Sequence, residues 1–267
     1  MYVTANRLRL HYQIDGQGPV VLFLHPVGLD LTWWESQVEA LRSEYQVLRL
    51  DFRGHGESAI ASPPYTLVDF ANDAHALLEE LKLAPAHIIG LSLGGMVAQV
   101  LALQYPADVR SLVLADTLCT LPAAARQAMR ARGEAAEHGG MAAVVQPTLE
   151  RWFTAGFLDS PLVAHCRQRL LANDVGAWSA TWRAIAEIDT LPRLTEICAP
   201  TLVTTGDADV STPVPAAQVI ADHIPGAILK VMPGAPHMAP YERPDLFNPL
   251  VLEFLRSVAE RKRLEPV

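Results

Sequence analysis

The sequence Gly-Leu-Ser-Leu-Gly-Gly at residues 90–95 constrains the fold more than any other stretch. A strand-like apolar run precedes it at residues 86–91, and an Ala-rich apolar run typical of a helix follows at residues 96–105. A G-x-S-x-G serine on a sharp turn between a strand and a helix is exposed above the sheet and can act as a nucleophile. The flanking glycines remove side chains that would collide in so tight a turn. The motif therefore makes Ser92 the candidate nucleophile.

The composition argues against several classes of partner. The chain has 267 residues, half of them hydrophobic, with a net charge of −8 and no basic block apart from residues 261–263. This balance disfavours nucleic acid or an anionic membrane as a partner. No apolar run approaches the ~18 residues that a membrane span needs. The sequence has no G-x-G-x-x-G, Walker or H-E-x-x-H motif, so we expect neither a cofactor nor a metal.

The cysteines and the first residues predict a cytoplasmic location. Three widely spaced cysteines form no C-x-x-C pair, which argues against a disulfide framework or a zinc site and favours a reducing compartment. Residues 1–6 have neither a basic start nor an apolar run, so no signal peptide is expected.

Strand-like and helix-like segments alternate along the chain, which predicts an α/β fold with a parallel sheet. Residues 2–15 indicate an antiparallel hairpin at a sheet edge. Apolar runs predict six buried strands, at residues 20–25, 46–51, 86–91, 111–116, 201–205 and 228–232. Helical patterns between them cover residues 36–44, 67–82, 95–105, 214–223 and 244–261.

The stretch between residues 117 and 199 is helical in pattern, at residues 123–137, 148–153, 163–173 and 176–188, and contains no strand-like run. We predict a helical cap at residues 118–198 above a core formed by residues 1–117 and 199–267. The cap contains Trp152, Trp178 and Trp182. These indoles either pack the cap onto the core or line a substrate pocket, since pockets are mostly apolar and aromatic.

A serine nucleophile needs a base, and the base needs an orienting acid. His237 follows the last predicted strand in a loop rich in turn residues, whereas His25 and His55 belong to other motifs at strand ends. The candidate acids are Asp207 and Asp209, which follow the strand at residues 201–205, and Asp116, which ends an earlier strand and is held in reserve.

Four blocks of the sequence resemble the α/β-hydrolase family over residues 20–255. They are residues 25–28 (His-Pro-Val-Gly), 51–58 (Asp-Phe-Arg-Gly-His-Gly-Glu-Ser), 90–96, and 206–213 together with 236–237. The resemblance implies an α/β-hydrolase fold, with an eight-stranded, mostly parallel sheet, helices on both faces and a helical cap after the sixth strand. It also implies that residues 51–58 form a structural turn, so that His55 is not the base.

The same resemblance implies roles for individual residues. The family's chain order of serine, acid and histidine fits Ser92, Asp209 and His237, since the family's acid lies four residues before the proline of its loop. The oxyanion hole would use the N–H groups of Val27 and Leu93. The family usually has His-Gly where this chain has His-Pro at residues 25–26, but the proline is not the expected donor.

Within the family, the chain resembles the 3-oxoadipate enol-lactonase group at residues 28–34, 91–99 and 150–154. This resemblance implies hydrolysis of a small carboxylic ester or lactone, and serine at position 92 argues against relatives that use aspartate there. For an anionic lactone, Arg151 or Arg183 of the cap could bind the carboxylate, or both could be solvated. The alternatives are a general short-chain carboxylesterase, a perhydrolase side activity, and a ligand-binding receptor with little turnover. The sequence leaves the oligomeric state unknown.

Overall fold

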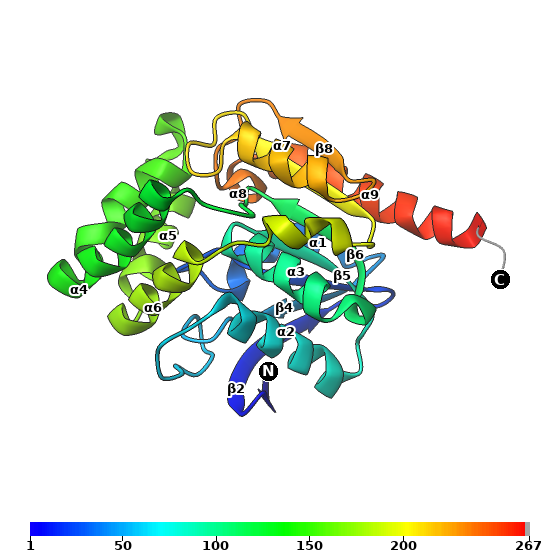
Figure 1. Ribbon diagram of the computed structural model, residues 1–267, viewed down its shortest axis with the longest axis horizontal. Coiled ribbons are helices and arrows are strands. Elements are labelled where there is room, and N and C mark those ends of the chain that lie inside the picture. The colour runs from blue at the N-terminus through cyan, green and yellow to red at the C-terminus, as the bar shows by residue number, and fades with distance from the viewer. Residues whose placement is uncertain (265–267) are drawn as a thin grey trace.

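Eight strands form one sheet in the order β1-β2-β4-β3-β5-β6-β7-β8 (Figure 1). The computed structural model describes residues 1–264 and the side chains up to residue 260, so the side chains of the basic block at 261–263 lie outside it. The strands are β1 (Tyr2–Ala5), β2 (Leu8–Asp15), β3 (Val20–Leu24), β4 (Gln46–Leu50), β5 (Ala86–Leu91), β6 (Val109–Ala115), β7 (Thr201–Gly206) and β8 (Ile228–Met232). β1 and β2 form the antiparallel hairpin that the sequence predicted, β2 also pairs antiparallel with β4, and the other pairs are parallel, in agreement with the predicted mostly parallel sheet.

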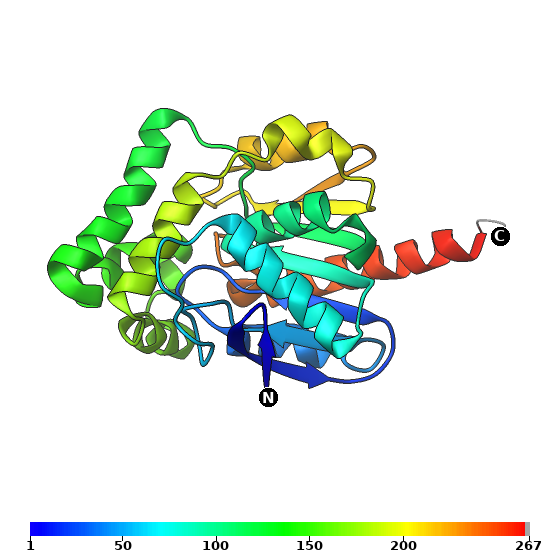
Figure 2. The same ribbon diagram turned by 60° about the horizontal axis from the view of Figure 1, so that its bottom comes forward.

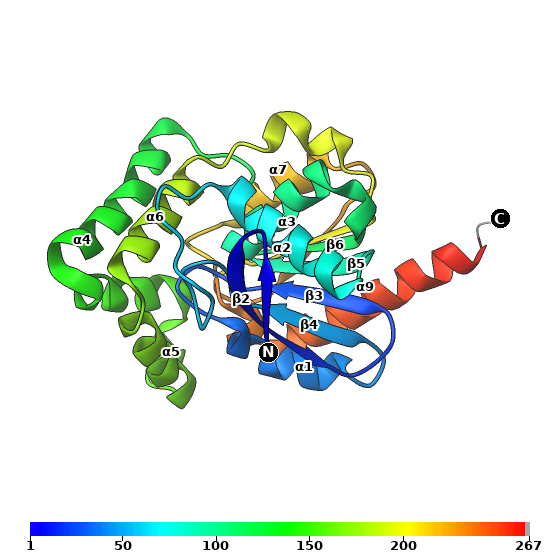
Figure 3. The same ribbon diagram turned by 90° about the horizontal axis from the view of Figure 1, so that it is seen from below.

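Helices cover both faces of this sheet (Figure 3). α1 (Glu35–Leu41) and α9 (Pro244–Leu264) contact each other on one face, while α2 (Leu67–Leu81) and α3 (Leu93–Gln104) pack together on the other. α7 (Val214–His223) packs on β7 and β8, and α8 (Ala239–Glu242) is a single turn before α9. Short 3-10 helices are η1 (Leu31–Trp34), η2 (Pro106–Asp108), η3 (Ala155–Phe157) and η4 (Leu191–Glu196).

Burial differs between the central strands and the last one. Every residue of β5 is buried, because helices cover it on both faces, as its continuous apolar sequence predicted. The prediction that β8 is buried was wrong, since only Met232 of that strand is buried. β8 has a single neighbour, β7, and Ile228 and Val231 are exposed at this edge of the sheet.

Three helices, α4 (Ala123–Trp152), α5 (Pro161–Leu171) and α6 (Val175–Ala186), lie between β6 and β7. They form a layer at one end of the sheet, and the C-terminal end of α9 projects from the opposite end (Figures 1 and 2). The sequence predicted four helical segments here, but the first two belong to α4. Gly140 interrupts α4 with φ 69° and ψ 179°, a conformation that glycine adopts easily.

Both connections to the cap helices are tied to α3. The chain leaving β6 and the chain entering β7 pair through Thr120 and Asp189, and Thr190 N donates to Cys119 O at 2.8 Å. The buried Gln99 of α3 accepts the Thr190 hydroxyl at 2.6 Å and donates to Leu118 O at 2.9 Å. The two connections therefore meet at Gln99, in the middle of α3.

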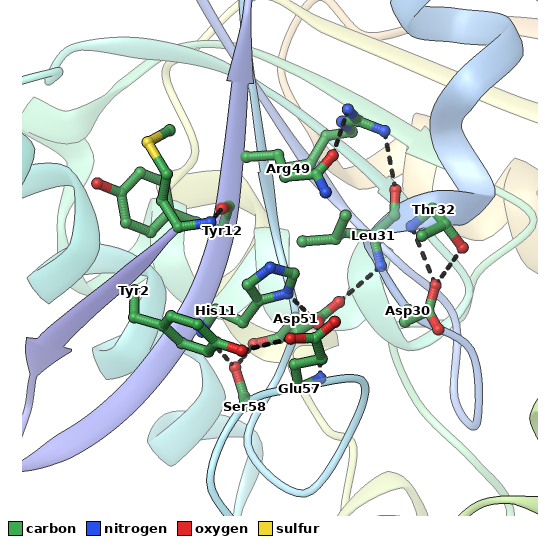
Figure 4. A network of polar contacts seen from close by, with 12 residues as sticks. Tyr2, His11, Tyr12, Asp30, Leu31, Thr32, Arg49, Asp51, Glu57 and Ser58 are labelled. Atoms are coloured by element: carbon green, nitrogen blue, oxygen red, sulfur yellow. Dashed lines mark hydrogen bonds and ion pairs between the residues drawn. The ribbon is translucent and has the colours of Figure 1, made fainter.

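A polar network joins the N-terminal hairpin to the loop after β4 (Figure 4). The Asp51 carboxylate lies 2.7 Å from His11 Nδ1 and accepts the N–H groups of Leu31 and Glu57. Ser58 Oγ donates to Asp51 O and accepts from His11 N. These contacts are internal to the fold, so residues 51–58 form a structural turn.

Candidate active site

Ser92 joins β5 to α3 in a strained backbone conformation, with φ 56° and ψ −112°. Strain of this kind persists only where the surroundings enforce it. A Cβ atom on Gly90 would lie 2.2 Å from Gly94 O, and a Cβ atom on Gly94 would lie 2.0 Å from Leu24 O. The two glycines are therefore required by close backbone contact, and they allow the turn to present Ser92 at the end of the sheet.

The sheet topology places the site at the carboxyl ends of the central strands. β3 lies between β4 and β5, so the connections diverge there and a crevice forms beyond the carboxyl ends of these strands. Val27 follows β3 and Ser92 follows β5, on either side of that crevice. Asp209 follows β7 and His237 follows β8, so four loops supply the groups that meet here.

The structure brings Ser92, His237 and Asp209 into one hydrogen-bonded chain. His237 Nε2 lies 3.0 Å from Ser92 Oγ, and His237 Nδ1 lies 2.8 Å from Asp209 Oδ2. All three side chains are buried. A hydroxyl, an imidazole and a carboxylate in this order are the arrangement that activates a serine oxygen.

The Asp209 carboxylate is held by several donors. Oδ1 accepts the N–H groups of Ser211 at 2.7 Å and Thr212 at 3.0 Å, and Oδ2 accepts the Thr212 hydroxyl. Burial alone raises the pKa of Asp209, but the neighbouring His237 and the Thr212 donors outweigh burial and bring this pKa to about 2. Asp209 is therefore ionised at neutral pH and can orient the imidazole and stabilise its charged form.

The other candidate acids contact other groups. Asp207 accepts Gly234 N at 2.6 Å on the protein surface. Asp116 is buried, with a positive φ of 43°, and its Oδ1 accepts Gly206 N at 3.0 Å. Neither carboxylate forms a hydrogen bond with His237 among the described residues, whereas Asp209 does.

The two other histidines in strand-end loops have structural partners. His25 Nδ1 donates to Pro26 O at 2.8 Å, while its Nε2 accepts Phe52 N at 3.0 Å. His55 Nδ1 donates to Arg53 O at 3.0 Å. Burial lowers the pKa of His25 well below its usual value and that of His55 to about 4. Both rings are neutral at neutral pH, and neither forms a hydrogen bond with Ser92 in the described part of the chain.

Val27 and Leu93 are buried beside Ser92. Leu93 is the first residue of α3, where the N–H groups have no acceptor within the helix. Between residues 1 and 264, neither the Leu93 N–H nor the Val27 N–H donates to another protein atom. Two N–H groups without protein acceptors next to a nucleophile provide what the stabilisation of an oxyanion requires.

A cavity of about 20 Å³ adjoins the Ser92 hydroxyl. Ligand pockets usually measure ~300–1,000 Å³, and about 20 Å³ is close to the space of one water molecule. This space is too small for an ester or lactone, so binding of such a substrate requires lining side chains to move. The lining residues are Val27, Ser92, Met96, Leu118, Met129, Arg132, Trp152, Trp182, Ile185, Ser211, Thr212 and His237.

The three predicted cap tryptophans separate into two groups. Trp152 and Trp182 line the cavity, but Trp178 does not. The Trp178 ring packs against Gly28, where a Cβ atom would lie 2.5 Å from Cζ3, and its Nε1 donates to Arg132 O at 3.3 Å. Trp178 thus packs the cap onto the loop after β3.

The sequence did not point to Arg132, a cation that lines the cavity. Of the two arginines it proposed, Arg183 pairs with Glu137 at 2.8 Å on an exposed surface, and Arg151 does not line the cavity. The helical pattern at residues 123–137 predicted the helix that carries Arg132. Which face of that helix turns toward Ser92 depends on how α4 packs against α6, which the pattern did not reveal.

Comparison with known proteins identifies the family. A family profile described as the alpha/beta hydrolase fold matches residues 19–244. The chain belongs to the α/β-hydrolase fold family. It is thus a hydrolase of this family, and the described residues include no helix long and apolar enough to cross a membrane.

Several relatives resemble this α/β hydrolase over nearly their whole length. 3-oxoadipate enol-lactonase 2 of Acinetobacter baylyi is 32% identical over 250 residues, which cover 92% of each chain. The solved enol-lactonase of Burkholderia xenovorans is 32% identical with a TM-score of 0.92, covering 96% of this chain and 100% of that one. A malate-bound thermophilic esterase of Thermogutta terrifontis is 29% identical with a TM-score of 0.89, covering 97% and 98%.

Proposed function

We propose that this α/β hydrolase cleaves a carboxylic ester or lactone through an acyl-enzyme on Ser92. The observation that carries the proposal is the hydrogen-bonded chain from Ser92 Oγ through His237 to the ionised Asp209. All three side chains are buried in the fold. Such a preorganised site favours attack on a carbonyl group.

The mechanism follows from the position of each group. His237 Nε2 takes the Ser92 proton as Oγ bonds to the carbonyl carbon, and the N–H groups of Val27 and Leu93 bind the oxyanion. Collapse breaks the ester bond, and His237 returns the proton to the leaving alkoxide. Water then attacks the acyl-enzyme with His237 as base, which releases the acid and restores Ser92. Asp209 stabilises the imidazolium throughout.

The relatives favour a lactone substrate. Two curated proteins and one solved structure that resemble the chain at 30–32% identity are named enol-lactonases. We therefore propose an activity like that of 3-oxoadipate enol-lactonase, with general short-chain carboxylesterase activity as the alternative. The ligand-binding receptor is less favoured, because the serine, imidazole and carboxylate are already assembled.

The remaining proposals concern organisation and location. We propose that residues 118–198 act as a cap over a core of residues 1–117 and 199–267, and that Trp152 and Trp182 contact the substrate. The last element of this proposed cap, η4 at residues 191–196, packs on α3 and α7 and so lies against the core. All three cysteines are free, which fits a reducing compartment, and we propose the cytoplasm.

A fluorophosphonate labelling experiment combined with a substrate panel tests the proposal. We expect wild-type protein to be labelled at Ser92 and to hydrolyse 3-oxoadipate enol-lactone or short p-nitrophenyl esters. The Ser92→Ala variant should lose labelling and about 10⁴-fold or more in kcat, because loss of the nucleophile disables the triad. Turnover by Ser92→Ala within tenfold of wild type would contradict the assignment.

A matched control separates loss of chemistry from loss of fold. Ser257 lies in α9, where its hydroxyl donates to Phe254 O, and it does not line the cavity. Ser257→Ala should keep full labelling and turnover, and circular dichroism should show that both variants are folded. A burst of one equivalent without sustained turnover by wild type would favour the receptor alternative.

A further inference from the structure

Arg132 is the cationic side chain of the cavity above Ser92. Among the described residues that line this cavity, Arg132 is the only lysine, arginine, aspartate or glutamate. It lies on the first half of α4, so the cap and not the core supplies this charge. The other lining side chains from the cap are apolar or aromatic, for example Met129, Trp182 and Ile185.

The Arg132 guanidinium has no carboxylate partner within 4.0 Å in the part of the chain that the structure describes. Four other arginines of the cap helices do pair with acids, namely Arg126 and Arg130 with Glu187, Arg169 with Asp30 and Arg183 with Glu137. Arg132 instead stacks over the Trp182 ring, 4.8 Å from its centroid. This cation–π contact offsets part of the cost of a partly buried charge.

The charges around Arg132 favour the binding of an anion beside it. Burial, together with the nearby charge of Arg151, lowers the pKa of Arg132 to about 10. Arg132 is nevertheless charged at neutral pH, and an anion beside it would be attracted. The net charge of the chain is −8, so this local cation differs in sign from the molecule as a whole.

We propose that Arg132 binds a carboxylate of the substrate and selects esters or lactones that carry one. A guanidinium recognises a carboxylate with two parallel hydrogen bonds, which fix orientation as well as adding affinity. With the ester carbonyl at Ser92 and the carboxylate at Arg132, the substrate would connect the core to the cap. This inference rests on the proposed function, since it assigns the substrate class of the same site.

Matched substrates measure this selectivity. Monoethyl adipate carries an ester and a carboxylate, and its primary amide, ethyl 6-amino-6-oxohexanoate, has the same size without the charge. We expect Arg132→Gln to lower kcat/KM for the monoester about 100-fold, as expected for loss of a charge-assisted pair, and to change that for the amide less than threefold. Arg132→Lys keeps the charge but loses the two-pronged geometry and should be intermediate.

The control variant is Arg183→Gln, which removes a cap arginine that is exposed and already paired with Glu137. It should leave the ratio of the two kcat/KM values at the wild-type level. If Arg132→Gln hydrolyses the amide normally and also leaves this ratio unchanged, the inference is wrong. An equal loss on both substrates with an intact circular dichroism spectrum would also overturn it, because Arg132 would then have no charge-specific role.

A binding measurement keeps the inference independent of turnover. Adipate should bind the Ser92→Ala protein in calorimetry, and the double variant Ser92→Ala/Arg132→Gln should bind it at least tenfold more weakly. If no ester is hydrolysed but this difference is found, the proposed function fails and the carboxylate site stands. If the esters are hydrolysed but Arg132→Gln alters neither adipate binding nor the substrate ratio, the carboxylate site fails alone.

Discussion

At the scale of single residues, Thr212 is the side chain that links acid and base. Its hydroxyl donates to Asp209 Oδ2 and lies 3.2 Å from His237 Nδ1, while its backbone N–H donates to Asp209 Oδ1. A substitution at this position can remove the hydroxyl contacts and keep the backbone contact. Thr212 is thus a positioning residue for the acid and the imidazole.

We expect Thr212→Val to lower kcat about tenfold, because a hydrogen bond to a charged group contributes ~1.5–3 kcal/mol. Thr212→Ser keeps the hydroxyl and should restore kcat to within threefold of wild type. The pH dependence of kcat provides a second readout, since the acidic limb should shift in the valine variant and not in the serine variant. Equal kcat values and pH profiles for all three proteins would show that the hydroxyl does not position the pair.

At the scale of elements, the loops after β7 and β8 fit together through Gly206. A Cβ atom at this position would lie 1.8 Å from Ala235 O, in the loop that carries His237. Ala208 N also donates to Ala235 O at 3.1 Å. The acid and the base come from separate loops, and this close backbone contact sets the distance between them.

Gly206→Ala should therefore separate the two loops. We expect a loss of ~1–3 kcal/mol in the free energy of unfolding, as for other overpacked sites, and a fall of at least tenfold in kcat/KM. Gly156→Ala is the matched control, because a Cβ atom there meets nothing within 4 Å, and it should change stability by less than ~0.5 kcal/mol. Urea denaturation and ester turnover measure both effects, and unchanged values for Gly206→Ala would contradict the close contact.

At the scale of the whole molecule, buried titratable groups make stability depend on pH. His87 lies at the start of β5, its Nδ1 2.7 Å from Ser111 Oγ, and burial lowers its pKa to about 4. Burial also raises the pKa of Asp51 and, well above its usual range, that of Asp116. Because their pKa values are raised in the folded protein, these carboxyl groups stabilise the fold as pH falls, whereas His87, with a lowered pKa, destabilises it. A variant of His87 separates its contribution from theirs.

We expect acidification to destabilise wild type more than His87→Gln. The unfolded chain protonates His87 below pH ~6.5, but the folded protein does so only near pH 4, so stability from neutral His87 is lost as pH falls from 6.5 toward 4. Between pH 7 and pH 5 the wild-type free energy of unfolding should fall about 2 kcal/mol further than that of His87→Gln. Urea denaturation of both proteins at the two pH values measures this difference, and parallel changes would contradict a depressed pKa.

The features that the sequence predicts well are set by local chemistry. Glycine spacing defines the turn around Ser92, and continuous apolar runs define strands such as β5, because both depend on neighbouring residues. β8 was predicted as buried for the same local reason. Its exposure depends on its place at the edge of the sheet, which the run at residues 228–232 does not encode.

The sequence by itself determined the α/β architecture, the segments that form strands and the strand ends from which Ser92, Asp209 and His237 emerge. Only the tertiary structure decided which side chains meet, because those contacts join segments far apart in the chain. Arg132 of α4 lines the cavity and Trp178 of α6 does not, although the two helices pack against each other in the cap. The small size of the cavity beside Ser92 likewise follows from long-range packing, which no local pattern records.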